Sequence, residues 1–142
     1  MKESIVLGSG SEELRKTLLK HTSQSTANFA TSNFAPLSDG SPSIFAFSKI
    51  EGYPVIIKTH SFYRLFECDP KSDCYAAVYV IRDDNLVRFA ANTISNSFSP
   101  SKAKSIVKIL SKCTTLKSLL DRSLSFGLKK DSKFDKNFPD LV

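Results

Sequence analysis

The chain has 142 residues, a length typical of one domain with a single hydrophobic core. Hydrophobic residues make up 41% of it, which excludes an intrinsically disordered chain, and no apolar run approaches the roughly 20 residues of a membrane-spanning helix. The net charge of +6 comes entirely from one end. Residues 1–98 hold ten Lys/Arg and ten Asp/Glu, whereas residues 99–142 hold ten Lys/Arg against four Asp. Such an imbalance predicts that this end meets an anionic partner.

The N-terminal segment predicts a short strand followed by a helix. Residues 5–7 form an apolar run, residues 8–11 are a Gly/Ser turn, and a helical pattern then extends to about His21. Ser9 with Glu12 matches the capping-box pattern. A turn before a helix can also bind a phosphate, but this one lacks the third glycine of dinucleotide-binding loops and the lysine of P-loops. We interpret residues 8–11 as a helix cap and leave phosphate binding open.

Residues 22–43 have no clear helical or strand periodicity and are rich in Ser, Thr, Asn, Pro and Gly. We predict a long loop or arm, which Phe29 and Phe34 hold against the body of the domain. In a second interpretation these aromatic side chains enter grooves of a partner protein. Phe29 and Phe34 are therefore the candidate protein-binding residues.

The centre of the chain predicts two β-hairpins. Residues 44–50 and 55–60 are β-rich runs around a Gly/Pro turn, and residues 75–82 and 86–93 flank the sequence Asp83-Asp84-Asn85. Alternation places four residues of the second hairpin on its core-facing side, namely Val78, Val80, Val87 and Phe89. Acidic residues at strand ends also suit a two-metal nuclease. Asp is common in turns, however, because it tolerates their backbone conformation, and we interpret Asp83 and Asp84 as turn residues.

The basic end, residues 99–142, predicts two helices. Ser99 and Pro100 suit a helix start, and a second helix covers residues 115–126 with Gly127 as its C-terminal stop. The apolar face of the first helix consists of Ala103, Ile106, Val107 and Leu110. A different face carries Lys104, Lys108 and Lys112, spaced four residues apart. Residues 128–142 are interpreted as an ordered strap or a frayed tail.

These elements predict one α+β domain over residues 1–142. The simplest arrangement is a mostly antiparallel sheet of about four strands, formed by the two hairpins. The N-terminal helix and the two basic C-terminal helices would pack on one face of it, because this buries both apolar stripes.

The residues with catalytic or metal-binding chemistry give no consistent motif. Cys68, Cys74 and Cys113 are an odd number, and with His60 they match no zinc-knuckle spacing. His21 and His60 are the only histidines. We therefore expect reduced thiols, no metal, no cofactor and no enzymatic activity. The N-terminus is too short and too soon interrupted for a signal peptide, so we expect an intracellular protein of the cytoplasm or nucleus that is neither secreted nor membrane-bound.

We expect a binding protein whose basic C-terminal helices engage a polyanion, with RNA or DNA favoured. Little sequence specificity is expected, because base edges are usually read by Arg, Asn and Gln. The candidate contacts are Lys102, Lys104, Lys108, Lys112, Lys117, Arg122, Lys129 and Lys130. The same lysines also fit a solvated surface. One alternative is a protein-binding accessory factor or inhibitor that uses the Phe-rich arm and a sheet edge, and this alternative includes self-association. A further alternative is sequestration of a small phosphorylated ligand.

Overall fold

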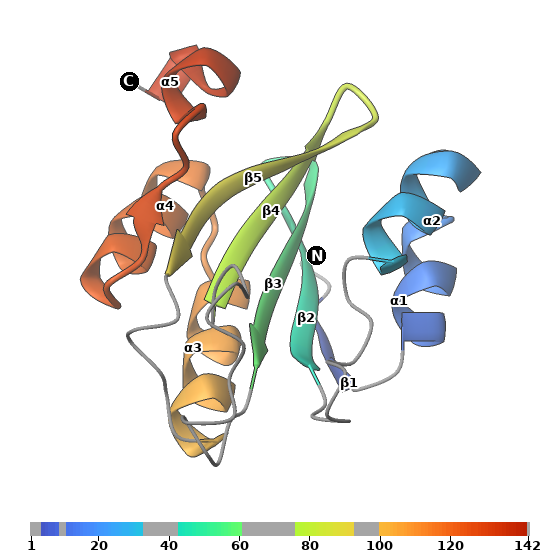
Figure 1. Ribbon diagram of the computed structural model, residues 1–142, viewed down its shortest axis with the longest axis horizontal. Helices are drawn as coiled ribbons and strands as arrows, with labels where there is room; N and C mark the ends of the chain where they lie inside the picture. Colours follow the sequence, from blue (N-terminus) through green and yellow to red (C-terminus); the bar gives the residue numbers. More distant parts are fainter. Residues whose placement is uncertain (1–3, 9–10, 33–42, 61–75, 93–99, 142) are drawn as a thin grey trace.

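The computed structural model describes residues 4–8, 11–32, 43–60, 76–92 and 100–141. They form an α+β fold around one antiparallel sheet, as predicted, with neighbouring strands in chain order (Figure 1). The strands are β1 (Ser4–Gly8), β2 (Ser43–Ile50), β3 (Tyr53–His60), β4 (Ala76–Arg82), β5 (Asn85–Asn92) and β6 (Lys129–Lys130). The predicted number of about four strands is too low, because β1 extends the first hairpin and the two-residue β6 pairs with β5.

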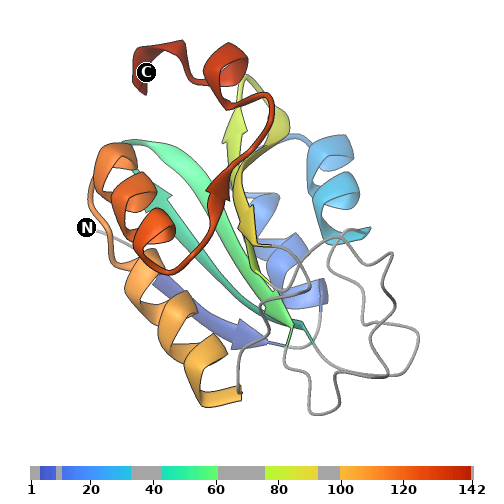
Figure 2. The same ribbon diagram turned by 60° about the vertical axis from the view of Figure 1, so that its left-hand side comes forward.

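Helices cover both faces of this sheet, whereas the sequence analysis places them on one (Figures 1 and 2). On one face lie α1 (Ser11–Leu18) and α2 (Gln24–Ser32). On the other lie α3 (Pro100–Ser111), α4 (Leu116–Ser125), α5 (Phe134–Asn137) and the 3-10 turn η2 (Pro139–Leu141). Within the described segments, no helix combines the length and the hydropathy needed to cross a bilayer.

The strands explain this three-layer arrangement, because successive side chains point to opposite faces. Phe45, Phe47 and Ile56 belong to the hydrophobic cluster with α1 and α2. Their neighbours Ala46, Val55 and Ile57 belong to the cluster with α3 and α4. The predicted core face of the second hairpin is confirmed: Val78, Val80 and Phe89 are buried in that second cluster, and Val87 packs against it.

The predicted loop over residues 22–43 is wrong for part of its length, because α2 lies within it. Ser23 caps this helix: its hydroxyl oxygen accepts a hydrogen bond from the Thr26 backbone N–H at 3.2 Å. Ala27 and Ala30, on the inner side of α2, are fully buried. Small side chains let the helix approach α1 and the sheet closely, which compensates for its modest intrinsic propensity.

Both predicted hairpins are confirmed, and each has a two-residue turn. Ile50 pairs with Tyr53 across Glu51-Gly52, and Arg82 pairs with Asn85 across Asp83-Asp84. All four turn residues have positive φ: 51° and 85° in the first turn, 51° and 60° in the second. This is the pattern of type I′ turns, whose twist matches that of the flanking strands. Asn85, predicted as a turn residue, is the first residue of β5.

The C-terminal residues up to 141 form an ordered strap, one of the two predicted forms. Gly127 ends α4 as predicted: with φ of +92° it lets Leu128 donate its backbone N–H to the Ser123 carbonyl at 3.0 Å. Phe134 and Phe138 then return to the core, where their ring centroids lie 5.3 Å and 5.0 Å from that of Phe89. The strap therefore completes the core on the α3/α4 face.

Candidate nucleic-acid interface

α3 presents a row of lysines because its apolar stripe is fixed on the sheet. Ile106, Val107 and Leu110 have no exposed surface and lie in the core formed with β2 and β3. The helix geometry then directs Lys104 and Lys108 outward, and Lys112 follows in the turn that ends the helix, where its backbone N–H donates to the Ile109 carbonyl at 3.2 Å. All three lysines are exposed. This confirms the predicted division of the helix into two faces. The side chain of Ala103 lies outside the described residues.

We call Lys104, Lys108 and Lys112 the lysine row. Residues four apart on a helix are separated by a rise of about 6 Å, so the row extends over about 12 Å. Among the residues that the structure describes, no carboxylate forms an ion pair with any of the three. Their ammonium groups are therefore available to an external anion.

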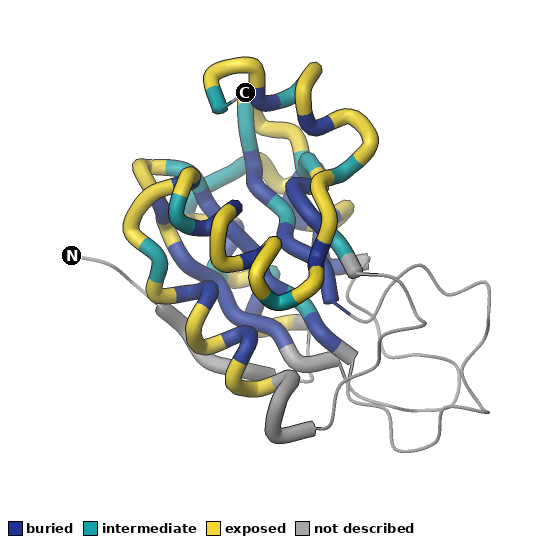
Figure 3. The backbone as a smooth tube through the Cα atoms, turned by 90° about the vertical axis from the view of Figure 1, so that its left-hand side faces the viewer, coloured by how far each residue is buried: buried dark blue, intermediate teal, exposed yellow. Residues whose placement is uncertain are grey.

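Four of the other predicted contacts belong to α4, which covers the same face of the sheet as α3, and to β6. Lys117 and Arg122 are exposed on α4, and Lys129 and Lys130 are exposed on β6, at the edge of the sheet. The Lys130 ammonium lies 5.0 Å from the centroid of the Phe134 ring. Figure 3 faces this layer and shows exposed positions along the outer side of its helices. Lys102 is in α3, but its side chain is not among those described.

Two of the four carboxylates in the basic end are neutralised by arginines from the sheet. Asp131 accepts a hydrogen bond from Arg88 at 2.8 Å, and Asp140 accepts one from Arg82 at 2.9 Å. Burial opposes ionisation of Asp131, but the hydrogen bonds from Arg88 and from the Lys133 backbone N–H outweigh it and lower its pKa. Each of these two carboxylates is therefore paired with an arginine of the sheet.

The acidic turn residues have a structural role. The Asp84 carboxylate accepts hydrogen bonds from the Thr22 hydroxyl and from the Ser23 backbone N–H, the latter at 2.9 Å. These hydrogen bonds hold the pKa of the Asp84 carboxyl well below its ordinary value, and those from Ser23 contribute most. Glu51, in the other hairpin turn, accepts from the Leu116 backbone N–H at 3.0 Å. The interpretation of Asp83-Asp84 as turn residues is thus confirmed, and sequence reasoning missed that both turns cap helices.

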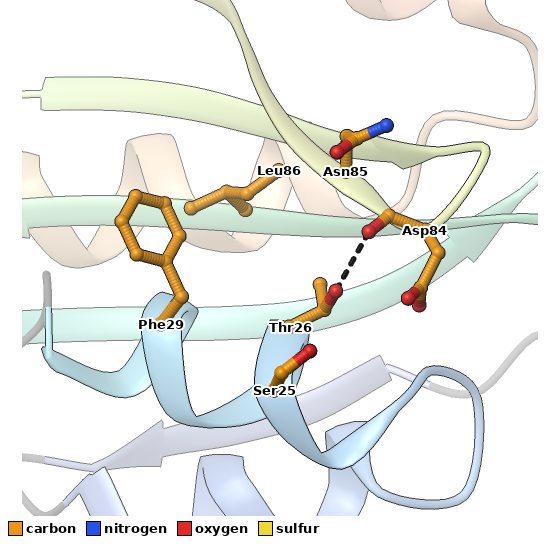
Figure 4. Close-up of a pocket in the computed structure, with 6 residues that line it drawn as sticks. All are labelled: Ser25, Thr26, Phe29, Asp84, Asn85 and Leu86. Carbon is orange, nitrogen blue, oxygen red and sulfur yellow. Dashed lines mark hydrogen bonds between the residues drawn. The ribbon is translucent and has the colours of Figure 1, made fainter.

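The second candidate site lies on the opposite face of the sheet. Phe29 is 60% exposed on α2, and it borders an open pocket of about 340 Å³ between α2 and the β4–β5 turn (Figure 4). The pocket is lined by Ser25, Thr26, Phe29, Asp84, Asn85 and Leu86. Phe34 lies outside the described residues. The sheet therefore separates Phe29 from the lysine row, and the structure does not join the two candidate sites.

The remaining candidates fall largely outside the described part of the chain. This applies to Cys68, Cys74 and the side chain of His60, and to Ser9 and Gly10 of the predicted cap. Cys113 is half-buried, and its thiol lies 3.8 Å from the Ile109 carbonyl oxygen. Among the described residues, no three His, Cys, Asp or Glu side chains gather in a way that could hold a metal ion.

Comparison of the chain with models of known protein families, with curated proteins and with solved structures found no significant match.

Proposed function

We propose that this protein binds nucleic acid through the lysine row, supported by Lys117 and Arg122 on α4. The observation that carries the proposal is the geometry of α3 and the turn after it, which hold three exposed cations in a row beside a fully buried apolar stripe. Each phosphate that a lysine neutralises releases condensed counterions, so a line of lysines gains affinity for a phosphate backbone.

The same residues favour binding with little sequence specificity. A lysine ammonium is a point charge, which contacts phosphate well but reads base edges less selectively than Arg, Asn or Gln. The basic end has Arg122 as its one arginine. Asn137 is the one Asn or Gln residue of the basic end. Its backbone carbonyl accepts a hydrogen bond from Arg82 at 3.0 Å, which fixes its backbone to the body of the protein. Contacts to the backbone of the nucleic acid therefore dominate in this proposal.

The test is a binding titration with mixed-sequence RNA and duplex DNA at two salt concentrations. The variant K104E/K108E/K112E should lose binding and remain folded, because the lysine row carries none of the apolar stripe. The control variant K16E/K20E/K49E makes the same change in net charge at exposed residues outside the basic end. Binding by wild type and control, and its loss in the first variant, would support the proposal. Absence of wild-type binding at low salt would reject it.

A second candidate function is protein binding through the pocket beside α2. It is favoured by one observation, the 60% exposure of a large aromatic side chain, Phe29, at the rim of a pocket that also contains Leu86. Self-association belongs to this alternative. An apolar contact of this kind should respond weakly to salt, whereas binding through the lysine row should weaken steeply.

A further inference from the structure

We infer that the preferred partner of the lysine row is a nucleic-acid duplex, contacted along its phosphate backbone, rather than a single strand. This inference rests on the proposed function and names the class of nucleic acid. Three properties of the described residues support it: the four-residue spacing of the lysines, the packing of the helix that carries Lys104 and Lys108, and the inward direction of the neighbouring aromatic side chains.

The spacing fits a regular, dense line of charge. The lysine row extends over about 12 Å. A B-form duplex carries one negative charge per about 1.7 Å of its axis when both strands are counted, so this length of duplex carries about seven phosphate charges, and the row faces those on its own side. A flexible single strand has a lower charge density and no fixed line of phosphates. The row therefore faces a higher local density of phosphate charge on a duplex, although its three ammonium groups neutralise at most three phosphates on either partner.

The rigidity of α3 favours a rigid partner. Ile106, Val107 and Leu110 are fully buried, and the Ser48 hydroxyl donates to the Ser111 carbonyl at 2.7 Å, which fixes the last turn of the helix to β2. A preorganised row of cations meets a preorganised duplex with little loss of conformational freedom. A single strand must be ordered before it can follow the same row, and that ordering reduces its affinity.

Two of the three aromatic side chains of residues 100–141 lie in the core, and the third, Phe126, is half-buried against it. Phe134 and Phe138 are 1% and 0% exposed, and both contact Phe89 edge to face. Proteins that bind single strands typically stack successive bases on exposed aromatic rings. Here the rings stabilise the fold, and the outward-facing side chains of the lysine row are cationic.

Counterion release gives the size of the expected preference. The salt slope is about 0.9 per phosphate contact on duplex DNA and about 0.7 on single strands. For the five contacts of the proposal, the lysine row with Lys117 and Arg122, the difference in slope is about 1.0. If duplex and single strand bind equally at about 1 M salt, this corresponds to about tenfold tighter binding of the duplex near 0.1 M salt. Replacing the three lysines of the row should lower the duplex slope by about 2.7.

The test is a titration of the whole protein with a mixed-sequence DNA duplex of about 20 base pairs and with each of its separated strands, at several salt concentrations. The proteins are wild type, K104E/K108E/K112E, K104Q/K108Q/K112Q and the control K16E/K20E/K49E. The glutamine set is K104Q/K108Q/K112Q, and it controls for loss of helical structure in the glutamate variant. Glu near a helix C-terminus opposes the helix dipole, whereas Gln does not.

Tighter binding of the duplex, with a slope that falls in the glutamine set but not in the control, would support the inference. Equal or tighter binding of the single strands would overturn it and leave the proposed function intact. Duplex preference that is unchanged in the glutamine set would also overturn it, because the lysine row would not be the contact. Absence of binding to any of these nucleic acids would reject the proposed function and the inference together.

Discussion

The Ser23 backbone nitrogen lies 2.9 Å from a carboxylate oxygen of Asp84, so a turn of the sheet caps the N-terminal end of α2. The other hairpin turn does the same for α4 on the opposite face, where Glu51 accepts from the Leu116 N–H at 3.0 Å. Backbone N–H groups at a helix start lack partners within the helix, and a carboxylate there also complements the helix dipole. The two turns thus fix one helix to each face of the sheet.

The first prediction concerns the charge of Asp84. We expect Asp84→Asn to lower the free energy of unfolding at pH 7, because Asn keeps one acceptor oxygen and tolerates positive φ but lacks the charge. The pKa of Asp84 is lowered in the folded state, so its stabilisation is present above its ordinary pKa of about 3.9 and is lost as the pH falls. Urea unfolding at a series of pH values measures this.

Asp83→Asn is the matched control, since Asp83 also has a positive φ in the same turn and does not take part in the contact with Ser23. The difference in stability between the two variants should be clear at pH 7 and should shrink below about pH 4. A difference that is constant across this range would contradict an electrostatic role for Asp84.

The second prediction concerns Arg82, which holds the C-terminal strap. Its guanidinium donates to the Asn137 carbonyl at 3.0 Å and lies 5.1 Å from the centroids of the Tyr53 and Phe138 rings. Hydrogen bonds from charged groups typically contribute about 1.5–3 kcal/mol, so Arg82→Ala should lower the free energy of unfolding by about 2 kcal/mol. Chemical denaturation gives this value.

Arg122→Ala provides the comparison, because Arg122 is exposed on α4. Its effect on stability should stay within about 0.5 kcal/mol. If the two alanine variants were equally stable, Arg82 would not hold the strap.

Much of this architecture could be predicted from the local pattern. The positions of both hairpin turns, the two faces of α3 and the stop at Gly127 depend on residues close together in the sequence. The sequence also indicates that helices cover both faces of the sheet. Val55-Ile56-Ile57 is a continuous apolar run, which is typical of a strand buried on both sides. Alternation within the second hairpin indicates only one buried face, so it does not predict the second layer of helices.

α2 could not be predicted in the same way, because its stability depends on contacts that are distant in sequence. The segment Gln24–Ser32 is rich in Ser, Thr and Asn, which favour caps and turns over helix interiors. What stabilises it is burial of Ala27 and Ala30 and the contact of Ser23 with Asp84, 61 residues away. For the candidate sites, the lysine row followed from helical spacing, whereas the pocket beside Phe29 required the fold.

The third prediction compares two phenylalanines that the sequence alone does not distinguish. Phe138 is fully buried against Phe89, so Phe138→Ala should cost about 3 kcal/mol of stability. Phe29 is 60% exposed, so Phe29→Ala should cost less than about 1 kcal/mol. Thermal and urea unfolding of the two variants test this. Equal costs would show that the strap is not part of the core, or that α2 packs differently.

The most direct test of nucleic-acid binding is to map the contact on the protein by NMR, with a short DNA duplex titrated into the isotope-labelled chain. Chemical-shift changes should concentrate on the backbone amides of residues 104–112 and on α4, and those of α2 should stay unchanged. The changes should diminish as salt is added, because the contact depends on phosphate charge. Shifts confined to α2 and the β4–β5 turn, or no shifts at low salt, would contradict the proposal that the lysine row binds nucleic acid.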